Sequence, residues 1–243
     1  MSKRTKTYFD LRDAFALPGC PICRLKAEFT EQFLDGIIYE KVNDPGLRHK
    51  LRQARGFCSE HAQGLVRKGA ALGVAIMMRD VLRQVLKALD EGHFQPLPAL
   101  SMARLKEAAQ PHRPRAATAA LVATLVPQSP CPVCAHVAEM EEVYCGTFAE
   151  NLLGEGGLLP LYRDSDGLCL PHFCQVLARV SHADVFQALV SVQRDLWARL
   201  EAQLSESIRK SDYRFSDEAL GDEAGSWLRA LAAMSGARLR HQD

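Results

Sequence analysis

The sequence lacks long hydrophobic runs. Its longest apolar stretch covers residues 69–78, about half of what a helix needs to cross a bilayer. The N-terminus is basic and polar, without the apolar segment of a secretory signal peptide. We therefore predict a cytoplasmic protein with no membrane partner, in a reducing compartment where paired cysteines more often bind metal than each other.

Aromatic residues are also scarce, at 7% of 243 residues, and runs of β-branched residues are few. Alanine, leucine, glutamate and arginine are abundant, and these residues favour helices over strands. With 47% hydrophobic and 24% charged residues, the chain has the composition of a globular protein and not of a disordered one. We predict an all-α fold.

Sequence signatures of common catalytic sites are missing. There is no Gly-x-Ser-x-Gly, no Gly-x-Gly-x-x-Gly and no Walker-type lysine motif. Glutamates recur at three-residue spacing in the pairs Glu28 with Glu31 and Glu139 with Glu142, but no histidine follows three residues after a glutamate, as di-metal helical bundles require. We predict no catalytic residues and favour a non-enzymatic protein.

What the sequence does contain is eight cysteines in a repeating pattern. Cys20-Pro21-Ile22-Cys23 is followed, after 34 intervening residues, by Cys58-Ser59-Glu60-His61. Cys131-Pro132-Val133-Cys134 is followed at the same spacing by Cys169-Leu170-Pro171-His172, an offset of 111 residues throughout. The pattern predicts an internal duplication that yields two pseudo-symmetric three-helix modules.

Apolar spacing and turn residues predict the helices of each module. In the first module we expect a helix after the first cysteine pair that stops at Asn43–Gly46, a short helix over 47–55 ended by Gly56, and a third from Ser59 to Leu89. In the second we expect 132–153, 158–164 and 171 to about 210. These helices predict four domains: a first metal-binding module at 1–91, a connector and packing helix at 92–126, a second metal-binding module at 127–211 and a C-terminal segment at 212–243. The C-terminal segment contains a closing helix at 226–234.

The two kinds of motif together provide four metal ligands per module. Three thiolates and one imidazole form a common tetrahedral zinc site that leaves no open position. We predict that each module is tied by one Cys3His site, the first formed by Cys20, Cys23, Cys58 and His61 and the second by Cys131, Cys134, Cys169 and His172. Two structural zinc ions are the favoured cofactors, iron-sulfur clusters on the same ligands are the alternative, and a thiol-disulfide couple is the least favoured interpretation. Covalent haem is disfavoured because Arg24 and Ala135 stand where its motif needs histidine.

Two cysteines fall outside the repeat. Cys145 aligns with Leu34 of the first module and is expected to fill a core position. Cys174 follows His172 by two residues, and we expect it either to lie beside the second metal site or to be a reactive thiol.

Charge is distributed unevenly behind a net charge of +1. Residues 1–115 carry 20 basic against 12 acidic side chains, whereas residues 116–243 carry 10 against 17. Arg48, Lys50, Arg52 and Arg55 crowd the short helix of the first module and form a candidate polyanion-binding cluster, with a solvated basic face as the simpler interpretation. The cluster is short and lacks aromatic residues, so we expect a protein partner and not nucleic acid; the pattern makes no prediction of oligomeric state.

Several of these segments carry a family resemblance. They are Gly19–Leu25, Asn43–Gly46, Arg55–His61, Cys131–Cys134 and Gly167–His172. Together they resemble an uncharacterised family of prokaryotic cytoplasmic proteins with two Cys-Pro-x-Cys and Cys-x-x-His halves. The resemblance covers about residues 8–235 and implies metal binding by all eight ligands, but it implies no activity. The sequence thus predicts a metal-binding helical protein with a binding or adaptor role, and the alternative is an iron-sulfur redox or electron-transfer protein.

Overall fold

The computed structural model describes residues 4–94, 116–215 and 217–237. All regular elements in these ranges are helices, which confirms the predicted all-α class. None of the helices described there is long and apolar enough to cross a membrane. The chain divides into two compact units: unit 1 comprises Met1–Phe29 and Val137–Asp243, and unit 2 comprises Thr30–His136.

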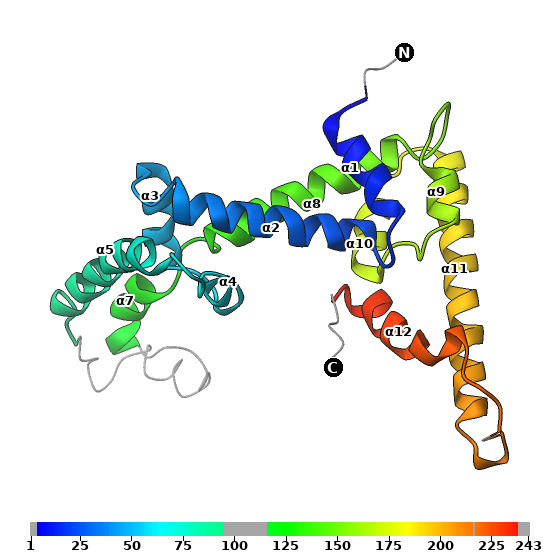
Figure 1. The fold of residues 1–243 in the computed structure, drawn as a ribbon. Helices are drawn as coiled ribbons and strands as arrows, with labels where there is room; N and C mark the ends of the chain where they lie inside the picture. Colours follow the sequence, from blue (N-terminus) through cyan, green and yellow to red (C-terminus); the bar gives the residue numbers. More distant parts are fainter. Residues whose placement is uncertain (1–3, 95–115, 216, 238–243) are drawn as a thin grey trace. The chain divides into compact units, whose positions relative to one another are not determined.

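This division does not follow the expected boundaries at residues 91 and 127. Two long helices, α2 (Pro21–Tyr39) and α8 (Pro132–Glu150), contribute to both units (Figure 1). Unit 1 therefore contains the beginning of α2 and most of α8, whereas unit 2 contains the end of α2 and the first turn of α8. The internal duplication itself stays a prediction.

Unit 1 is built around a cluster of aromatic rings. Phe15, Phe148 and Tyr162 contact one another with ring centroids 5.2–6.1 Å apart, and all three are buried. The Tyr162 hydroxyl donates a 2.6 Å hydrogen bond to Gln193, which satisfies its one polar group inside the core. The elements of unit 1 that accompany α2 and α8 are α1 (Lys6–Phe15), α9 (Leu159–Arg163), α10 (Leu170–Leu177), α11 (Ala183–Lys210), η1 (Tyr213–Phe215), η2 (Asp222–Gly225) and α12 (Ser226–Ser235).

Unit 2 is organised by α3 (Pro45–Ala54), which packs on α5 (Ala71–Asp90). The Asp44 side chain caps α3 by accepting a 2.6 Å hydrogen bond from the Leu47 amide, and Pro45 occupies the first helical position. The chain then turns through left-handed backbone at Arg55 and Gly56. The left-handed end of the short helix is confirmed. The preceding helix ends at Tyr39, before the expected stop, and Pro45 and Gly46 of that stop are the first residues of α3.

The core of unit 2 is aliphatic. Leu34, Ile37, Leu51 and Met77 are each no more than 1% exposed. The helix expected at the end of the connector is observed as α7 (Ala116–Leu125), and it packs against α5. Its described side chains range from half-buried to exposed, so it is not the fully buried helix that its composition indicates. Most of the connector before it lies outside the described residues.

The third helix of the first module was expected to run unbroken from Ser59 to Leu89, and this is wrong. The structure has α4 (Ser59–Gly64) and α5, separated by residues 65–70. Gly69 has φ +86°, which a helix does not accommodate. Leu65 and Ala70 in this break are buried, so packing stabilises the turn over a continuous helix.

The second expected long helix, from residue 171 to about 210, is also divided. It is observed as α10 and α11, with His182 in extended backbone before α11 begins. Hydrophobic periodicity continued across both breaks, but it does not reveal a short non-helical connection in which apolar residues remain buried. The break leaves α10 as a separate short helix, and its N-terminus lies at the site described below.

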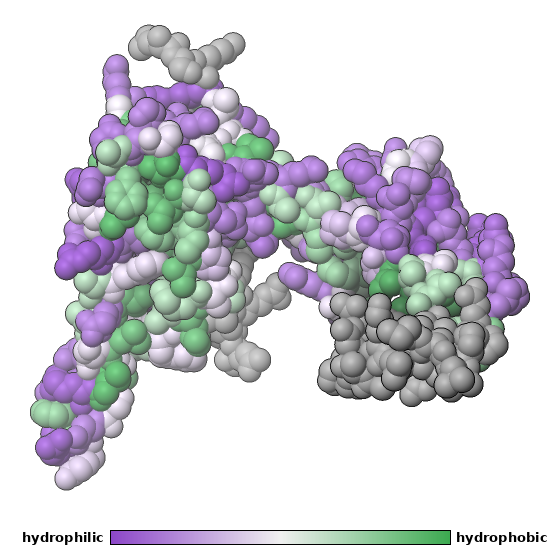
Figure 2. Space-filling model, turned by 180° about the vertical axis from the view of Figure 1, so that it is seen from behind, coloured by the Kyte–Doolittle hydropathy of each residue, from purple (hydrophilic) through white to green (hydrophobic). Residues whose placement is uncertain are grey.

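The helix expected at 226–234 is observed as α12, which packs against α10 and α11 and ends at Gly236 in left-handed backbone. Its outer face is less buried than the sequence indicates, because Trp227 and Leu231 are more than half exposed. Figure 2, in which unit 1 lies on the left, shows hydrophobic residues reaching the surface of this unit between hydrophilic ones.

Candidate metal centres

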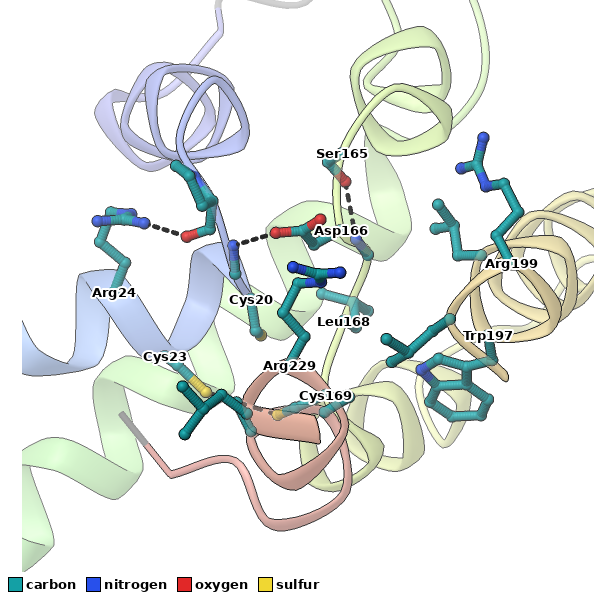
Figure 3. A pocket seen from close by; sticks show the side chains of 18 of the residues that line it. Cys20, Cys23, Arg24, Ser165, Asp166, Leu168, Cys169, Trp197, Arg199 and Arg229 are labelled. Atoms are coloured by element: carbon teal, nitrogen blue, oxygen red, sulfur yellow. Dashed lines mark hydrogen bonds between the residues drawn. The ribbon is translucent and has the colours of Figure 1, made fainter. Parts of the chain in front are cut away.

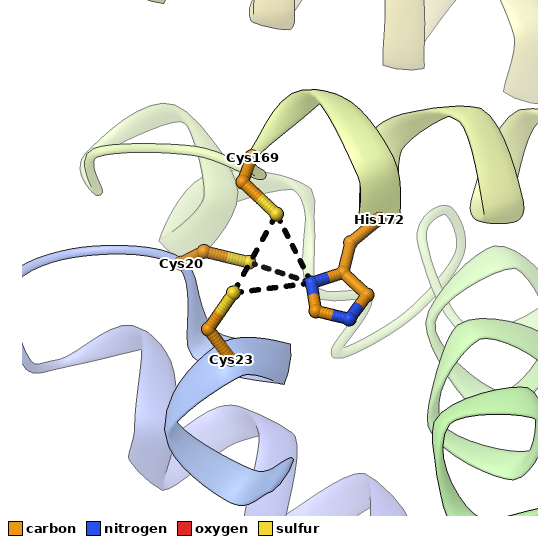
Figure 4. Close-up of side chains that lie close together, drawn as sticks. All are labelled: Cys20, Cys23, Cys169 and His172. Atoms are coloured by element: carbon orange, nitrogen blue, oxygen red, sulfur yellow. Dashed lines mark hydrogen bonds between the residues drawn. The ribbon is translucent and has the colours of Figure 1, made fainter. Parts of the chain in front are cut away.

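Two groups of three cysteines and one histidine come together in the described part of the chain. Site 1 consists of Cys20, Cys23, Cys169 and His172 in unit 1, and site 2 of Cys58, His61, Cys131 and Cys134 in unit 2. In each site, the donor atoms lie within 4.8 Å of one another. Figure 4 shows the three sulfur atoms of site 1 converging on one ring nitrogen of His172. All eight residues predicted from the motifs therefore take part in a donor set.

Each ligand pair is positioned by the start of a helix. Cys58 and Cys169 are the N-cap residues of α4 and α10, in extended backbone, and His61 and His172 follow in the first turn. Cys20 and Cys131 directly precede α2 and α8, and their carbonyls accept the amides of Arg24 and Ala135. Because the N-cap and third helical positions lie side by side, the spacing Cys-x-x-Cys or Cys-x-x-His places two donors at one helix end.

The pairing of the motifs differs from the prediction. We expected the Cys20 pair to join Cys58 and His61, and the Cys131 pair to join Cys169 and His172. Instead, each Cys-Pro-x-Cys pair lies with the Cys-x-x-His pair from the other half of the sequence. The reason is that α2 and α8, each of 19 residues, begin in one unit and end in the other. The Cys-x-x-His pair that follows each helix therefore belongs to a different unit from the Cys-Pro-x-Cys pair that precedes it.

The distances between donor atoms fit one tetrahedral ion. With zinc–sulfur bonds of about 2.3 Å and a zinc–nitrogen bond of about 2.0 Å, tetrahedral donors lie roughly 3.5–3.8 Å apart. In site 1, Nδ1 of His172 lies 3.1–3.4 Å from the three sulfur atoms, and the sulfurs of Cys23 and Cys169 are 3.5 Å apart. In site 2, Nδ1 of His61 lies 3.1–3.8 Å from its three sulfurs. Both sets therefore fit a closed four-ligand site.

Burial and mutual repulsion make these thiols costly to ionise together without a cation. The hydrogen bond with Cys169, together with burial and the charge of neighbouring sulfurs, raises the pKa of the Cys23 thiol. Burial, with contributions from Cys58 and Cys131, raises the pKa of Cys134 to about 12. A divalent cation would compensate this crowding, and the positive ends of the two helix dipoles at each site act in the same direction.

Site 1 has a carboxylate behind its histidine. Nε2 of His172, the ring nitrogen that faces away from the sulfurs, lies 2.9 Å from Glu141 Oε1, and Lys26 Nζ is 2.9 Å from the same oxygen. Burial opposes ionisation of Glu141, but the hydrogen bonds from His172 and Lys26 outweigh it and lower the pKa of this carboxyl. A carboxylate in this place fixes the ring orientation and the tautomer with Nδ1 free to bind metal.

Gly236 brings the C-terminal end of α12 against site 1. A Cβ atom on this residue would lie 3.3 Å from Cys169 Sγ and 3.9 Å from Cys23 Sγ. The Gly236 carbonyl also lies 3.4 Å from Cys23 Sγ. Glycine serves two purposes at this position: its left-handed backbone ends α12, and its lack of a side chain admits the sulfurs.

The two remaining cysteines lie outside both donor sets. Cys145 is completely buried in α8, which confirms the expected core position, and burial raises the pKa of its thiol to about 11. Cys174 is exposed on α10, two residues after His172. That Cys174 is reactive, or contacts a metal ligand, stays a prediction.

The basic cluster of α3 is largely engaged within unit 2. Arg48 and Arg52 both pair with Asp80, at 3.3 and 2.8 Å, and Arg55 donates to the carbonyls of Arg52 and Thr124. Lys50 is exposed. The pairing with Asp80 favours a structural role for the arginines, and binding of a polyanion by this cluster stays a prediction.

Three residues around site 1 were not identified from the sequence: Glu141 and Gly236, which contact its ligands, and Lys26, which contacts Glu141. Glu141 lies next to Glu142, which the glutamate spacing did single out, but its role depends on α10 packing beside α8. Lys26 comes three residues after Cys23 in α2 and reaches Glu141 from a different helix. Gly236 was recognisable as a helix end, but its proximity to the sulfurs depends on how α12 docks.

Comparisons with known proteins give a family and no activity. Residues 2–240 match a family described as "Family of unknown function (DUF6062)". The chain is 25% identical over 218 residues to a protein of Caldicellulosiruptor sp. (strain Rt8B.4) described as "Uncharacterized 23.9 kDa protein in xynA 3'region". That alignment covers 89% of this chain and 95% of the relative. No solved structure matches the chain.

Proposed function

Since the chain belongs to the family of unknown function DUF6062, we propose a function from its two donor sets: a helical protein that binds two structural zinc ions and serves as a binding or adaptor protein. One ion is held by Cys20, Cys23, Cys169 and His172, and the other by Cys58, His61, Cys131 and Cys134. The observation that carries the proposal is the presence of two complete donor sets, one in each unit.

The ligand chemistry supports zinc. Three thiolates and an imidazole are soft and borderline donors, which select zinc over calcium or magnesium. The Glu141 carboxylate behind His172 is the kind of partner that metal-binding histidines commonly have in zinc sites. In the cytoplasm, where we place the protein, thiols stay reduced and able to bind metal.

The compactness of the donor sets supports a single ion over an iron-sulfur cluster. A cluster places an iron and sulfide core between its protein ligands, so the ligands surround that core. In site 1 the histidine nitrogen instead lies within 3.4 Å of all three sulfurs. The space between the donors therefore suits one ion, and iron-sulfur chemistry is the less favoured alternative.

Complete donor sets support a structural role in place of catalysis. A catalytic zinc keeps one position open for water or substrate, but three cysteines and a histidine fill all four. At each site, the ion would join the starts of two helices: α2 and α10 at site 1, and α4 and α8 at site 2. Each site takes a Cys-Pro-x-Cys pair from one proposed repeat and a Cys-x-x-His pair from the other, an exchange consistent with a duplicated ancestor.

A protein partner is the other part of the proposal. Trp227, Leu231 and Met234 are 48–55% exposed along α12 and give unit 1 a partly apolar surface. Large exposed apolar side chains, aromatic ones above all, are the residues that protein interfaces use most. The arginines of α3 are paired with Asp80, which argues against nucleic acid as the partner.

Elemental analysis combined with an absorption spectrum tests the metal assignment. We expect two zinc ions per chain in protein purified without added metal, and no visible absorption. Removal of zinc by a strong chelator should lower the helix content, because the ions hold short helices in place. Iron with sulfide, accompanied by visible absorption, would contradict the proposal and establish the redox alternative.

A further inference from the structure

A pocket of about 800 Å³ lies beside site 1 in unit 1. Its walls come from four segments: the residues around the start of α2, the loop 164–169 before α10, the middle of α11, and α12 (Figure 3). Cys20, Cys23 and Cys169 form part of one wall. The volume lies within the range of small-molecule sites, roughly 300–1,000 Å³.

Three arginines line this pocket without an acidic partner in the described part of the chain. Arg24 donates to the Pro18 carbonyl, Arg199 to a backbone carbonyl at 3.4 Å, and Arg229 to Gln203 Oε1 and a backbone carbonyl at 2.9 and 2.7 Å. Arginines elsewhere commonly pair with carboxylates, as Arg67 does with two. The positive charge of the pocket arginines is thus held only by neutral acceptors.

Two buried donors in the same walls add to this positive character. Arg24 Nε and Trp197 Nε1 find no hydrogen-bond acceptor in the described part of the chain. A buried donor without an acceptor is unfavourable, and a nearby negative charge reduces that cost electrostatically. Arg24 and Arg229 are themselves half-buried, so solvent screens their charges less than those of exposed groups.

Negative groups in the lining limit the charge of a ligand. Asp164 and Asp166 are exposed, and Asp166 is engaged by the Gly19 amide at 2.7 Å. If a divalent cation occupies site 1, its three thiolates leave one net negative charge on that wall. Three arginines, two aspartates and this site together leave the lining close to neutral, so it suits a ligand with no more than one negative charge, placed near Arg229 and away from the sulfurs.

The rest of the lining is apolar. Leu196 and Leu200 of α11, together with Leu228 and Ala232 of α12, provide an aliphatic surface, and Trp197 extends it. A ligand consisting only of an anionic group would leave this surface in water, whereas a ligand with an apolar body would bury it. The pocket thus combines one charge-recognising side with one hydrophobic side.

We propose that this pocket binds a small organic monocarboxylate, with its carboxylate on the Arg229 guanidinium and its apolar body against Trp197 and the leucines of α11 and α12. Guanidinium groups recognise carboxylates through two parallel hydrogen bonds. Figure 3 shows Arg229 extending from α12 towards the loop that carries Asp166. This inference goes beyond the structural zinc proposal, since it concerns a ligand and not the metal.

Octanoate is a suitable probe, with octan-1-ol and octyl phosphate as comparisons, each titrated into the zinc-loaded full chain by calorimetry. We expect saturable binding of one octanoate per chain, tighter than octanol and tighter than octyl phosphate. In a Trp227→Phe variant, Trp197 is the remaining tryptophan, and its fluorescence should change on binding. Absence of saturable octanoate binding, or equal binding of octanol, would overturn the proposal; tighter binding of octyl phosphate would overturn the monocarboxylate class.

Variants separate recognition from folding. Arg229→Gln should weaken octanoate binding by about tenfold or more, because it removes a charge-assisted hydrogen bond. The same change should leave octanol binding unchanged. Arg194→Gln is the matched control, because Arg194 is 81% exposed on α11 and does not line the pocket. Should Arg229→Gln fail to fold, Ala233→Leu tests the same site by filling it, and unchanged octanoate affinity there would contradict the proposal.

Zinc content is measured for every protein in the series. Protein with two zinc ions that does not bind octanoate overturns this inference and leaves the proposed function intact. Protein that binds octanoate but contains no zinc overturns the proposed function and leaves this inference intact.

Discussion

Metal content of paired cysteine substitutions tests which motifs share an ion. In the structure, Cys58 and Cys131 belong to one site and Cys20 to the other. Cys58→Ser combined with Cys131→Ser should therefore remove one zinc and retain one. Cys20→Ser combined with Cys58→Ser should remove both. If the motifs paired within each half of the sequence, the two double variants would show the opposite result.

The structure also sets the size of the stability effect. Helix α4 has six residues, and His61 is its one buried side chain. Isolated helices shorter than about 12–15 residues are marginal in water, so little besides the metal holds α4 in place. We expect Cys58→Ser to lower the free energy of unfolding of unit 2 by about 4 kcal/mol, in the range where loss of a metal site is diagnostic.

Metal per chain is measured by elemental analysis and native mass spectrometry, and stability by urea unfolding followed by circular dichroism. Cys174→Ser is the control, because this exposed thiol lies outside both donor sets, and it should retain both zinc ions. Retention of one zinc by the Cys20 and Cys58 double variant, together with loss of both from the Cys58 and Cys131 variant, would refute the pairing.

Three further substitutions probe the surroundings of the sites. Glu141→Ala removes the carboxylate behind His172 and should weaken zinc binding at site 1 by about 10–100-fold in a chelator competition. Gly236→Ala places a Cβ in left-handed backbone near the sulfurs and should lower the unfolding free energy by about 1 kcal/mol, measured in urea. Asp80→Asn should cost about 1 kcal/mol near neutral pH. The hydrogen bond from Arg52 lowers the pKa of Asp80. The stabilisation from this ion pair is therefore complete above about pH 4, the pKa of Asp in the unfolded chain, and is lost as the pH falls through the lower pKa of the folded protein. The unfolding free energies of the variant and the parent protein should become equal in acid.

Each of these substitutions has a matched control. Glu139→Ala removes an exposed carboxylate two residues from Glu141 and should leave zinc affinity unchanged. Gly146→Ala lies inside α8 with open space around its Cβ position, so it should stabilise the helix slightly. Asp90→Asn removes an exposed charge at the end of α5 and should not alter the acid dependence. A control that behaves like its partner would contradict the specific contact.

The helices were largely predictable, and the errors share a cause. The ends of α3 and α12 follow from residues such as Asp44, Pro45 and Gly236, which act within one turn of the chain. The breaks between α4 and α5 and between α10 and α11 were missed, because apolar residues on both sides of each break are buried. Periodicity records that a residue is buried but not whether the backbone around it is helical.

The amino-acid sequence by itself determined which eight residues form the two donor sets, because a side chain at a helix N-cap and another three residues later are brought together by local backbone geometry. Tertiary structure decided which pairs meet. The 19-residue helices α2 and α8 each begin in one unit and end in the other, so each unit combines the first motif of one half with the second motif of the other half. Packing also places Glu141 behind His172 and Gly236 against Cys169. These contacts join residues from 31 to more than 60 positions apart, and sequence spacing does not constrain such distances.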